Sequence, residues 1–230
     1  MILVSQKLSI KRKLAFLLSR VTKKSELDYL KYWEHRYSVH GDSGKGSYAE
    51  HATYKSRVVN DEISANGVRS VLDFGCGDGN LLKYLNVENY LGLDVSKTTI
   101  YNCSEIFKSD KTKRFMVISP GKPLEIEKFD LVMSLEVLMH ITNEEDFLWT
   151  LQEIFLHSRN LVIIQTPLFP LIEYRPGSHE NYRELFPYLL PYIGNFSLEK
   201  VVVHPSTTIA GRVKGEIGTM SSDFLVFKRN

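Results

Sequence analysis

The stretch VLDFGCGDGN, residues 71–80, constrains the fold of this chain more than any other segment. Three glycines at alternate positions directly follow a short apolar run. Glycine this dense weakens a regular helix or strand, so the backbone here must turn tightly or approach another group closely. Because RSVLDF precedes the loop and NLLKYL follows it, the pattern predicts a buried strand, a glycine loop and the start of a helix.

Three common motifs do not match this stretch. Asp73-Phe74-Gly75 has the letters of the metal-binding triplet of protein kinases, but the chain has neither an H-R-D catalytic loop nor a suitably spaced glycine-rich ATP loop. No Lys-Ser or Lys-Thr closes the loop, as a P-loop would require. The order Gly75-x-Gly77-x-Gly79 also differs from the G-x-G-x-x-G of dinucleotide-binding folds. The loop therefore predicts a different nucleotide-like ligand.

An acidic residue also ends the next predicted strand. NYLGLDVS, residues 89–96, is an apolar run ending in Asp94, about 20 residues past the loop, where nucleotide-binding folds place a ribose-binding carboxylate. A carboxylate there can accept hydrogen bonds from both ribose hydroxyls. The alternative is that Asp94 caps the following helix, a role that Ser96 can share. The repeated order of strand, acid and helix favours the ribose interpretation.

These motifs resemble those of the class I S-adenosylmethionine-dependent methyltransferases. In that family an acidic residue and G-x-G-x-G end the first strand, as Asp73, Gly75, Gly77 and Gly79 do here, and a carboxylate ends the second. The fourth strand often begins F-D-L-V and runs into E-x-x-x-H, matched by FDLVMSLEVLMHI, residues 129–141. The resemblance covers residues 67–166 well. It implies S-adenosyl-L-methionine as the cofactor, with contacts from Asp73, Gly75, Cys76, Gly77, Asp94, Val95, Ser119, Glu136, Tyr48 and Lys55.

The order of predicted elements, with the resemblance, indicates an α/β fold: a Rossmann-like, doubly wound sheet of seven strands, mostly parallel with an antiparallel C-terminal edge hairpin. Continuous apolar runs such as NLVIIQ are typical of parallel strands buried on both faces. Thr142-x-x-Glu145 predicts a capping box for the last core helix. Strands are expected near residues 69–74, 89–94, 113–118, 128–134, 160–166, 197–204 and 222–228. Helices are expected near residues 79–86, 96–108 and 143–158.

The predicted catalytic groups follow the fourth strand. Asp73, Asp94 and Glu136 all fall at the carboxyl ends of strands, the edge where open α/β sheets bind ligands. Methyl transfer to a hydroxyl needs an aligned acceptor and a group that removes its proton, which suits histidine. A helical turn would place Glu136 and His140 on one face, with Glu136 orienting the ring or contacting the cofactor. We expect His140 as the general base; the alternative is that it only packs between apolar neighbours.

A second polar cluster follows the fifth strand, in RPGSHENYRELF, residues 175–186. In class I enzymes the segment after this strand commonly covers the acceptor. His179, Tyr182 and Arg183 fall at helical spacing on one face, so His179 is a second catalytic candidate and the other two are candidate acceptor-binding residues. The alternative is a solvated helix with Ser178 as its N-cap, and the sequence leaves the two interpretations open.

Residues 25–66 are expected to hold N-terminal helices and a lid loop. Y-W-x-x-R-Y at residues 32–37 and S-G-x-G-S-Y at 43–48 resemble a subgroup of methyltransferases found among glycan and capsule biosynthesis enzymes. A glycine-hinged loop beside a cofactor site is a candidate lid. Tyr48 would stack on the cofactor, and Lys55 or Arg57 would pair with its carboxylate. The alternative is that the aromatic residues are core and the loop is a linker.

Residues 1–24 differ in charge from the rest of the chain. They carry seven Lys or Arg residues and no acid, so the remainder has a net charge of −5 although the whole chain is +2. A mildly acidic remainder argues against a nucleic-acid substrate, which needs a basic footprint. Apolar residues recur opposite the basic ones and predict an amphipathic helix that docks on an anionic membrane, on a partner or back on the domain.

The composition is typical of one cytoplasmic enzyme domain, residues 67–230. A chain of 230 residues, 43% of them hydrophobic, can bury one sizeable core. No apolar stretch approaches the roughly 20 residues needed to span a bilayer. Two cysteines and no secretory signal predict a reducing, cytoplasmic setting, with peripheral membrane contact through residues 1–24. No cluster of carboxylates suggests a metal site, so no metal ligand is assigned and metal dependence stays open.

We therefore expect a methyltransferase of the EC 2.1.1 type that uses S-adenosylmethionine to O-methylate a sugar hydroxyl of a glycan or glycan precursor. The alternative among enzymes is a small-molecule or lipid-precursor methyltransferase. The alternative outside enzymes is a catalytically silent scaffolding module that keeps the cofactor fold, against which the intact Asp73, Gly75, Gly77 and Asp94 argue. The sequence makes no prediction of the oligomeric state.

Overall fold

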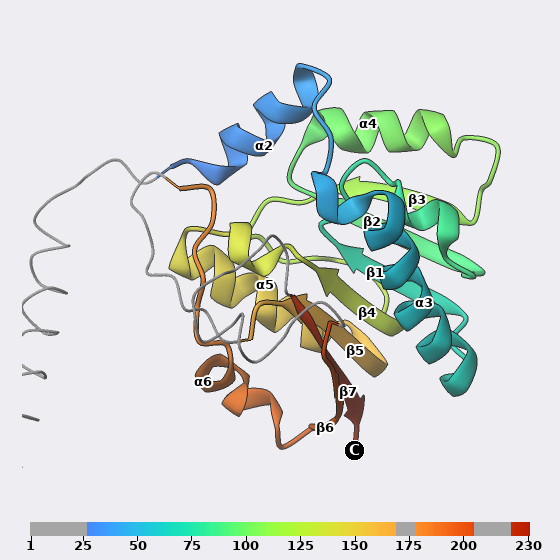
Figure 1. Ribbon diagram of the computed structural model, residues 1–230, viewed down its shortest axis with the longest axis vertical. Helices are drawn as coiled ribbons and strands as arrows, with labels where there is room; N and C mark the ends of the chain where they lie inside the picture. Colours follow the sequence, from blue (N-terminus) through green and yellow to red (C-terminus); the bar gives the residue numbers. More distant parts are fainter. Residues whose placement is uncertain (1–26, 169–177, 205–221) are drawn as a thin grey trace, which may run out of the picture.

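The computed structural model describes residues 27–168, 178–204 and 222–230 and has a seven-stranded sheet at its centre (Figure 1). The strand order is β3-β2-β1-β4-β5-β7-β6. The strands from β3 to β5 run parallel, and β7 runs antiparallel to both β5 and β6. This confirms the predicted fold class. The strands are β1 (Ser70–Phe74), β2 (Asn89–Asp94), β3 (Lys113–Val117), β4 (Phe129–Leu135), β5 (Ser158–Thr166), β6 (Phe196–Val202) and β7 (Asp223–Arg229).

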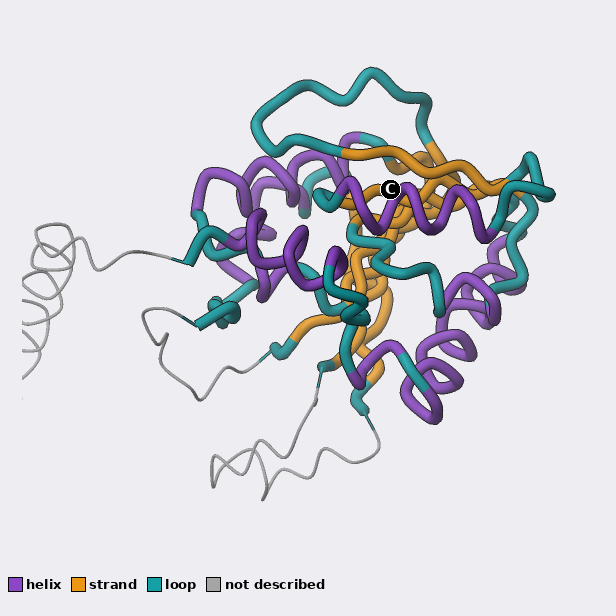
Figure 2. Tube along the Cα trace, turned by 90° about the horizontal axis from the view of Figure 1, so that it is seen from above, coloured by secondary structure: helices purple, strands orange, loops and turns teal. Residues whose placement is uncertain are grey.

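Helices cover both faces of the sheet, which Figure 2 shows along the strands. On one face, Val58, Val59 and Ile63 of α3 pack with buried residues of β1, β4, β5 and β7. Helix α4 contacts β2, β3 and α2. On the other face, α5 packs Phe147, Leu151 and Ile154 against the alternate residues of the same strands. Successive side chains of each strand point to opposite faces of the sheet, so both faces of the sheet are apolar. The α-helices are α2 (Tyr29–Ser38), α3 (Ala49–Asn66), α4 (Lys97–Ile106), α5 (Glu144–Leu156) and α6 (Phe186–Leu189).

The helix expected at residues 79–86 is wrong in length, because only a 3-10 turn, Leu81–Tyr84, forms there. The 3-10 turn ends early because the side chain of Asn60 in α3 contacts the backbone at the end of the turn. This side chain donates to the Tyr84 carbonyl at 2.9 Å and accepts from the Asn86 amide at 2.8 Å. These contacts satisfy backbone groups that a longer helix would have satisfied itself.

The capping box predicted for α5 is also wrong by one residue. The N-cap is Asn143, whose side chain accepts from the Asp146 amide at 2.9 Å. Thr142 instead donates its hydroxyl to the carbonyl of Leu27 at 3.1 Å, which joins the start of the described chain to the α5 entrance. Asparagine and threonine are both good caps, so a tertiary contact decided between them.

Helix α2 lies over the carboxyl ends of the strands and is fixed to α4. The Glu34 carboxylate accepts from the hydroxyls of Ser96 at 2.7 Å and Thr98 at 2.6 Å. Because Ser96 and Thr98 begin α4, the negative charge also lies at the positive end of that helix dipole. This contact holds α2 above the edge of the sheet where ligands bind in such folds.

The predicted N-terminal amphipathic helix, residues 1–24, lies outside the described residues. The division of the chain at residues 24 and 66 stays a prediction. Within the described ranges, none of the helices has the length and apolarity needed to cross a bilayer.

Candidate active site

The three acidic strand ends predicted from the sequence lie around one cavity of about 480 Å³. Asp73 ends β1 within one residue, Asp94 ends β2, and Glu136 follows β4 directly. Because β2 and β4 each pair in parallel with β1, the carboxyl ends of the three strands lie at the same edge of the sheet. Other predicted site residues that line the cavity are Gly75, Cys76, Gly77, Lys55, Val95, His140, His179 and Tyr182.

Asp94 is held in place by backbone donors and faces the cavity. One carboxylate oxygen accepts from the Gly77 amide at 3.1 Å and the other from the Ser96 amide at 2.9 Å. Ser96 alone is the N-cap of α4, since its side chain accepts from the Thr99 amide. The helix-cap interpretation of Asp94 is therefore wrong. Burial raises the pKa of Asp94 to about 6, although the backbone donors oppose that shift.

Asp73 is a second buried carboxylate, one strand away. It is 5% exposed and accepts a hydrogen bond from the Tyr90 hydroxyl at 2.7 Å. Burial raises the pKa of Asp73 to about 7, and the negative charge of Asp94 adds to that rise. A carboxylate can accept about four hydrogen bonds, so both residues keep acceptor capacity for a ligand. The pair makes this end of the cavity suited to a ligand rich in hydrogen-bond donors and positive charge.

The glycines between these carboxylates have backbone angles that disfavour side chains, with φ of 81° at Gly75, 55° at Gly77 and 71° at Gly79. A Cβ atom at Gly75 would lie 2.4 Å from a Val137 methyl group, and one at Gly77 would lie 2.3 Å from the Ser43 hydroxyl. The loop therefore needs glycine because other protein segments pack directly on it. Its amides at Gly75 and Cys76 donate to the Leu93 carbonyl, which fixes the loop to the end of β2.

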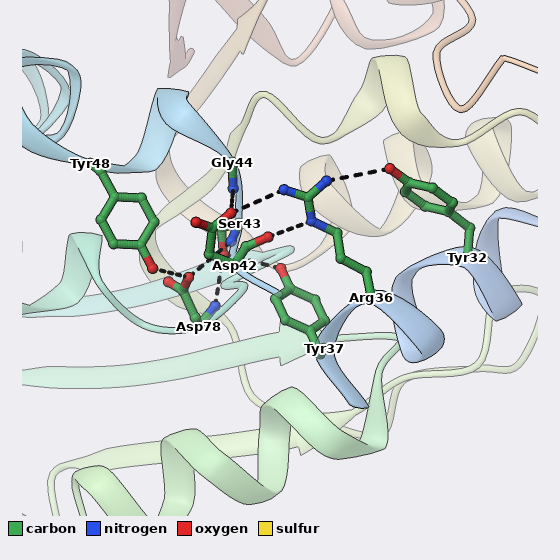
Figure 3. Close-up of polar contacts among 8 residues, drawn as sticks. All are labelled: Tyr32, Arg36, Tyr37, Asp42, Ser43, Gly44, Tyr48 and Asp78. Atoms are coloured by element: carbon green, nitrogen blue, oxygen red, sulfur yellow. Dashed lines mark hydrogen bonds and ion pairs between the residues drawn. The ribbon is translucent and has the colours of Figure 1, made fainter. Parts of the chain in front are cut away.

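Residues 42–48 close over the glycine loop through Asp78 (Figure 3). The Asp78 carboxylate accepts from the Ser43 amide at 2.9 Å and from the Tyr48 hydroxyl at 2.6 Å, and the Asp78 amide donates to the Ser43 hydroxyl. The Tyr48 hydroxyl thus holds residues 42–48 to the glycine loop, and the stacking of Tyr48 on the cofactor stays a prediction. Arg36 fixes the other end of the lid by donating to the carbonyl and carboxylate of Asp42.

Lys55 and Glu136 form a buried ion pair at the floor of the cavity. Their side chains are 4% and 9% exposed, and the ammonium group contacts one carboxylate oxygen. The predicted pairing of Lys55 with a cofactor carboxylate is therefore not what the structure contains. Glu136 adopts a φ of 59°, uncommon for a residue with a side chain, and this turns it toward Lys55. It does not orient His140, as the helical spacing predicted, because only a 3-10 turn, Leu138–His140, follows it.

His140 lines the cavity and lies among aromatic rings. Its Nδ1 atom lies 3.1 Å from the His179 carbonyl oxygen, and its ring is nearly parallel to that of His179 with centroids 5.4 Å apart. Trp33 meets the His140 ring edge-on at 5.0 Å. Burial lowers the pKa of His140, so the ring is neutral at pH 7. A neutral ring whose Nδ1 donates to a carbonyl leaves Nε2 able to accept a proton or bind a cation.

Residues 178–185 form no helix, so both the predicted common helical face and the solvated-helix alternative are wrong there. His179 and Tyr182 still line the cavity, together with Glu180, which the sequence analysis did not single out. Arg183 turns away: it pairs with Glu144 at 2.9 Å and donates to the Ile141 carbonyl, which makes it a structural residue. The Asn181 amide donates to the Met139 carbonyl, and this bond fixes the segment beside the 3-10 turn that ends at His140.

Ser119 is exposed and is not among the residues that line the cavity, and its role as a cofactor contact stays a prediction. Its neighbours Ile118 and Pro120 line the wall instead. The sequence analysis also missed Glu34 and Asp78, which position α2 and the lid. Asp78 was visible within GCGDGN, but only its contact with a loop 30 residues upstream shows its role.

The residues present fit an adenosyl sulfonium cofactor. Asp94 lies at the strand end where a ribose is bound in such folds, and it retains free acceptor capacity. Gly75, Cys76 and Gly77 line the cavity beside Asp94, so a ligand there can lie against the loop. Pro120 and Ile118 supply an apolar wall on the same side of the cavity.

Comparison with known proteins agrees with this site. Residues 72–155 match a family model described as a methyltransferase domain. The ribosomal RNA small subunit methyltransferase C of Pseudoalteromonas translucida (strain TAC 125) is 27% identical over 126 residues, which cover 51% of this chain. The matched part covers 37% of that relative, so the chain spans well under two thirds of its length.

Two solved structures share the fold. The N-methyltransferase NodS from Bradyrhizobium japonicum WM9, in complex with S-adenosyl-L-homocysteine, has a TM-score of 0.65 at 12% identity, covering 88% of this chain and 98% of that one. The magnesium protoporphyrin IX methyltransferase ChlM from Synechocystis PCC 6803, with bound S-adenosylmethionine, has a TM-score of 0.60 at 16% identity, covering 90% and 100%. The expected glycan and capsule subgroup stays a prediction. The chain thus has the fold of these two methyltransferase structures, and residues 72–155 match a methyltransferase domain.

Proposed function

We propose that the chain binds S-adenosyl-L-methionine and transfers its methyl group to an acceptor in the same cavity. The observation that carries this proposal is the Asp94 carboxylate, buried at the end of β2, fixed by two backbone amides and facing the cavity beside the glycine loop. Asp94 would hold the ribose hydroxyls, the backbone of residues 75–77 would lie against the cofactor, and Asp73 would attract its ammonium group. When bound, the cofactor supplies a methyl group on a sulfonium sulfur.

We further propose a hydroxyl acceptor, of the sugar type predicted from the sequence. The end of the cavity away from Asp94 contains imidazole, phenol and carboxylate groups from His140, His179, Tyr182 and Glu180. Such groups orient a hydroxyl and take up its proton, whereas an already nucleophilic amine or thiolate needs less help. Trp33 adds an aromatic wall to this end. The net charge of −5 outside residues 1–24 argues against extending the ribosomal RNA relative's substrate to this chain.

Calorimetric titration with S-adenosylhomocysteine tests the cofactor proposal. The wild-type chain should bind it, and Asp94→Ala should weaken binding at least tenfold, about 1.4 kcal/mol, because charge-assisted hydrogen bonds are lost. Asp110→Ala is the matched control, since Asp110 is an exposed carboxylate outside the cavity lining. Absence of binding at millimolar ligand would instead support the silent scaffolding module.

A donor-turnover screen tests the acceptor. Formation of S-adenosylhomocysteine is measured with nucleotide sugars and oligosaccharides in one set and with small phenols, amines and lipid precursors in another. Turnover in the first set supports the sugar hydroxyl proposal. Turnover confined to the second set replaces it with the small-molecule or lipid-precursor alternative.

A further inference from the structure

Two histidines and a glutamate meet at the acceptor end of the cavity. His140, His179 and Glu180 each offer one ligand atom, and these three atoms lie within 4.8 Å of one another. All three residues are partly buried and line the cavity. Two ligands bound to one Zn²⁺ ion lie about 3 to 4 Å apart, given metal–ligand bonds near 2.1 Å. A small inward movement of the side chains would therefore complete a three-ligand site.

Two of the three ligand side chains, those of His140 and Glu180, have a second polar atom that a neighbouring group holds in place. The His140 Nδ1 atom faces the His179 carbonyl at 3.1 Å, which selects the tautomer whose Nε2 carries a free lone pair. The Tyr182 hydroxyl donates to one Glu180 oxygen at 2.7 Å, while the other Glu180 oxygen lies 3.7 Å from the Nε2 atom of His179. Metal-binding histidines and carboxylates characteristically have such outer partners, which fix their orientation.

The backbone also holds the two segments of the cluster together. The Asn181 amide donates to the Met139 carbonyl at 2.6 Å, so the residues beside His140 and Glu180 are joined directly. The side chain of Tyr32 stacks on the His179 ring from α2, with centroids 5.0 Å apart. The histidines therefore have little freedom to separate, which favours a preformed site over a chance approach of mobile side chains.

We propose that His140, His179 and Glu180 bind a divalent transition-metal cation of the Zn²⁺ type at the acceptor end of the cavity. Two imidazoles and one carboxylate match such cations better than Mg²⁺ or Ca²⁺, which prefer oxygen ligands. Three protein ligands leave coordination positions open, as in catalytic rather than structural zinc sites. His140 is then a ligand and not the free general base that the sequence predicts.

The open positions face the space that an acceptor would occupy, so a hydroxyl oxygen is the group that they would take. A bound cation would lower the pKa of such a hydroxyl, whose proton passes to solvent. The new C–O bond forms as the methyl–sulfur bond of the cofactor breaks, and S-adenosylhomocysteine leaves with the bond's electron pair. This role rests on the proposed methyl transfer, whereas metal binding itself does not. The sequence analysis assigned no metal ligand because it looked for a cluster of carboxylates, whereas this site includes two histidines that lie 39 residues apart.

Titration of the full chain with Co²⁺, followed by visible absorption, tests the site after chelator treatment and dialysis. The wild-type chain should bind about one equivalent, Zn²⁺ should displace it, and millimolar Mg²⁺ should not. His179→Ala should weaken Co²⁺ binding at least tenfold, and Glu180→Gln, which keeps the side-chain shape, should weaken it and alter the spectrum. His51→Ala is the matched control, because His51 faces His204 on another surface, outside the cavity lining.

The inference is overturned if the wild-type chain binds no Co²⁺ or Zn²⁺ up to millimolar concentration. It is also overturned if His179→Ala and Glu180→Gln bind as the wild type does, or if His51→Ala removes the signal. Titration of the same metal-free protein with S-adenosylhomocysteine separates the two proposals. Cofactor binding without metal binding leaves the proposed function standing and rejects the metal site, and the opposite result rejects only the function.

Discussion

Replacing Asp73 by asparagine tests whether burial of this carboxylate in the cavity lowers the free energy of unfolding. Asp73 is 5% exposed and accepts from the Tyr90 hydroxyl at 2.7 Å. Asparagine has nearly the same shape and keeps an oxygen that can accept this bond, while its amide nitrogen can reach the cavity that Asp73 lines. The substitution therefore removes mainly the buried charge. We expect Asp73→Asn to stabilise the protein at pH 8 and to weaken cofactor binding.

The size of the effect follows from proton linkage. Burial raises the pKa of Asp73 from its ordinary value of 3.8 to about 7. Between these two values the folded state holds more protons than the unfolded state, so the free energy of unfolding falls as the pH rises. Each unit corresponds to about 1.4 kcal/mol, which sets a ceiling of about 4 kcal/mol above pH 7. Below pH 4 the penalty disappears, because the carboxyl group is protonated in both states.

Urea unfolding followed by circular dichroism at pH 4.5 and pH 8 measures this difference. We expect Asp73→Asn to exceed the wild-type free energy of unfolding by about 2 to 4 kcal/mol at pH 8, and by about 1 kcal/mol or less at pH 4.5. In a thermal scan near pH 8, each 1 kcal/mol corresponds to about 2 to 4 °C in a chain of this size. Asp110→Asn, at an exposed site, is the control. A variant no more stable than the wild type at pH 8, or a difference independent of pH, would refute the reasoning.

Three further substitutions test the lid, the ion pair and the glycine loop. Tyr48→Phe removes a hydroxyl bond to the glycine loop, so affinity for S-adenosylhomocysteine should fall about threefold to tenfold with little change in melting temperature; an unchanged affinity would separate the lid from binding. Lys55→Met leaves Glu136 buried and unpaired and should cost about 3 to 5 kcal/mol in urea unfolding, much of which the double variant with Glu136→Leu should restore. Gly77→Ala should destabilise the chain by about 1 to 3 kcal/mol, and adding Ser43→Gly should recover part of this loss; no recovery would mean that backbone strain alone is responsible.

The sheet could be predicted because each strand carries its own signal. The apolar runs around Val71, Leu91, Val132 and Ile163 are buried on both faces, and their ends in the structure fall within about two residues of the predicted ones. The helices depended more on distant contacts. The turn at residues 81–84 is short because Asn60 satisfies its backbone, and no pattern within residues 79–86 reveals that contact.

Some parts of the candidate site could also be predicted from the sequence, and others could not. Its cofactor end is formed by the ends of β1 and β2, where Asp73, Asp94 and the glycines each lie within a recognisable local motif. Its lid was predicted as a segment but not in its contacts, because the hydroxyl of Tyr48 joins Asp78, 30 residues away. Arg183 turns away from the cavity because it pairs with Glu144, 39 residues earlier in the chain, and no pattern within residues 175–186 reveals that contact.

The acceptor end is where sequence reasoning fails most, and the cause is physical. Three contacts that shape it join separate segments: His140 meets the carbonyl of His179, Trp33 of α2 lies against the ring of His140, and Tyr32 stacks on His179. Methyltransferases share one methyl donor, so the cofactor end of the site must stay constant among them. Two adjacent strand–loop units are enough to form this end. The acceptor varies from one enzyme to another, so its end is assembled from segments outside those units. We therefore expect the choice of acceptor in this chain to depend on α2 and residues 178–182 rather than on the glycine loop. Exchange of these two segments should change the acceptor while leaving cofactor affinity intact.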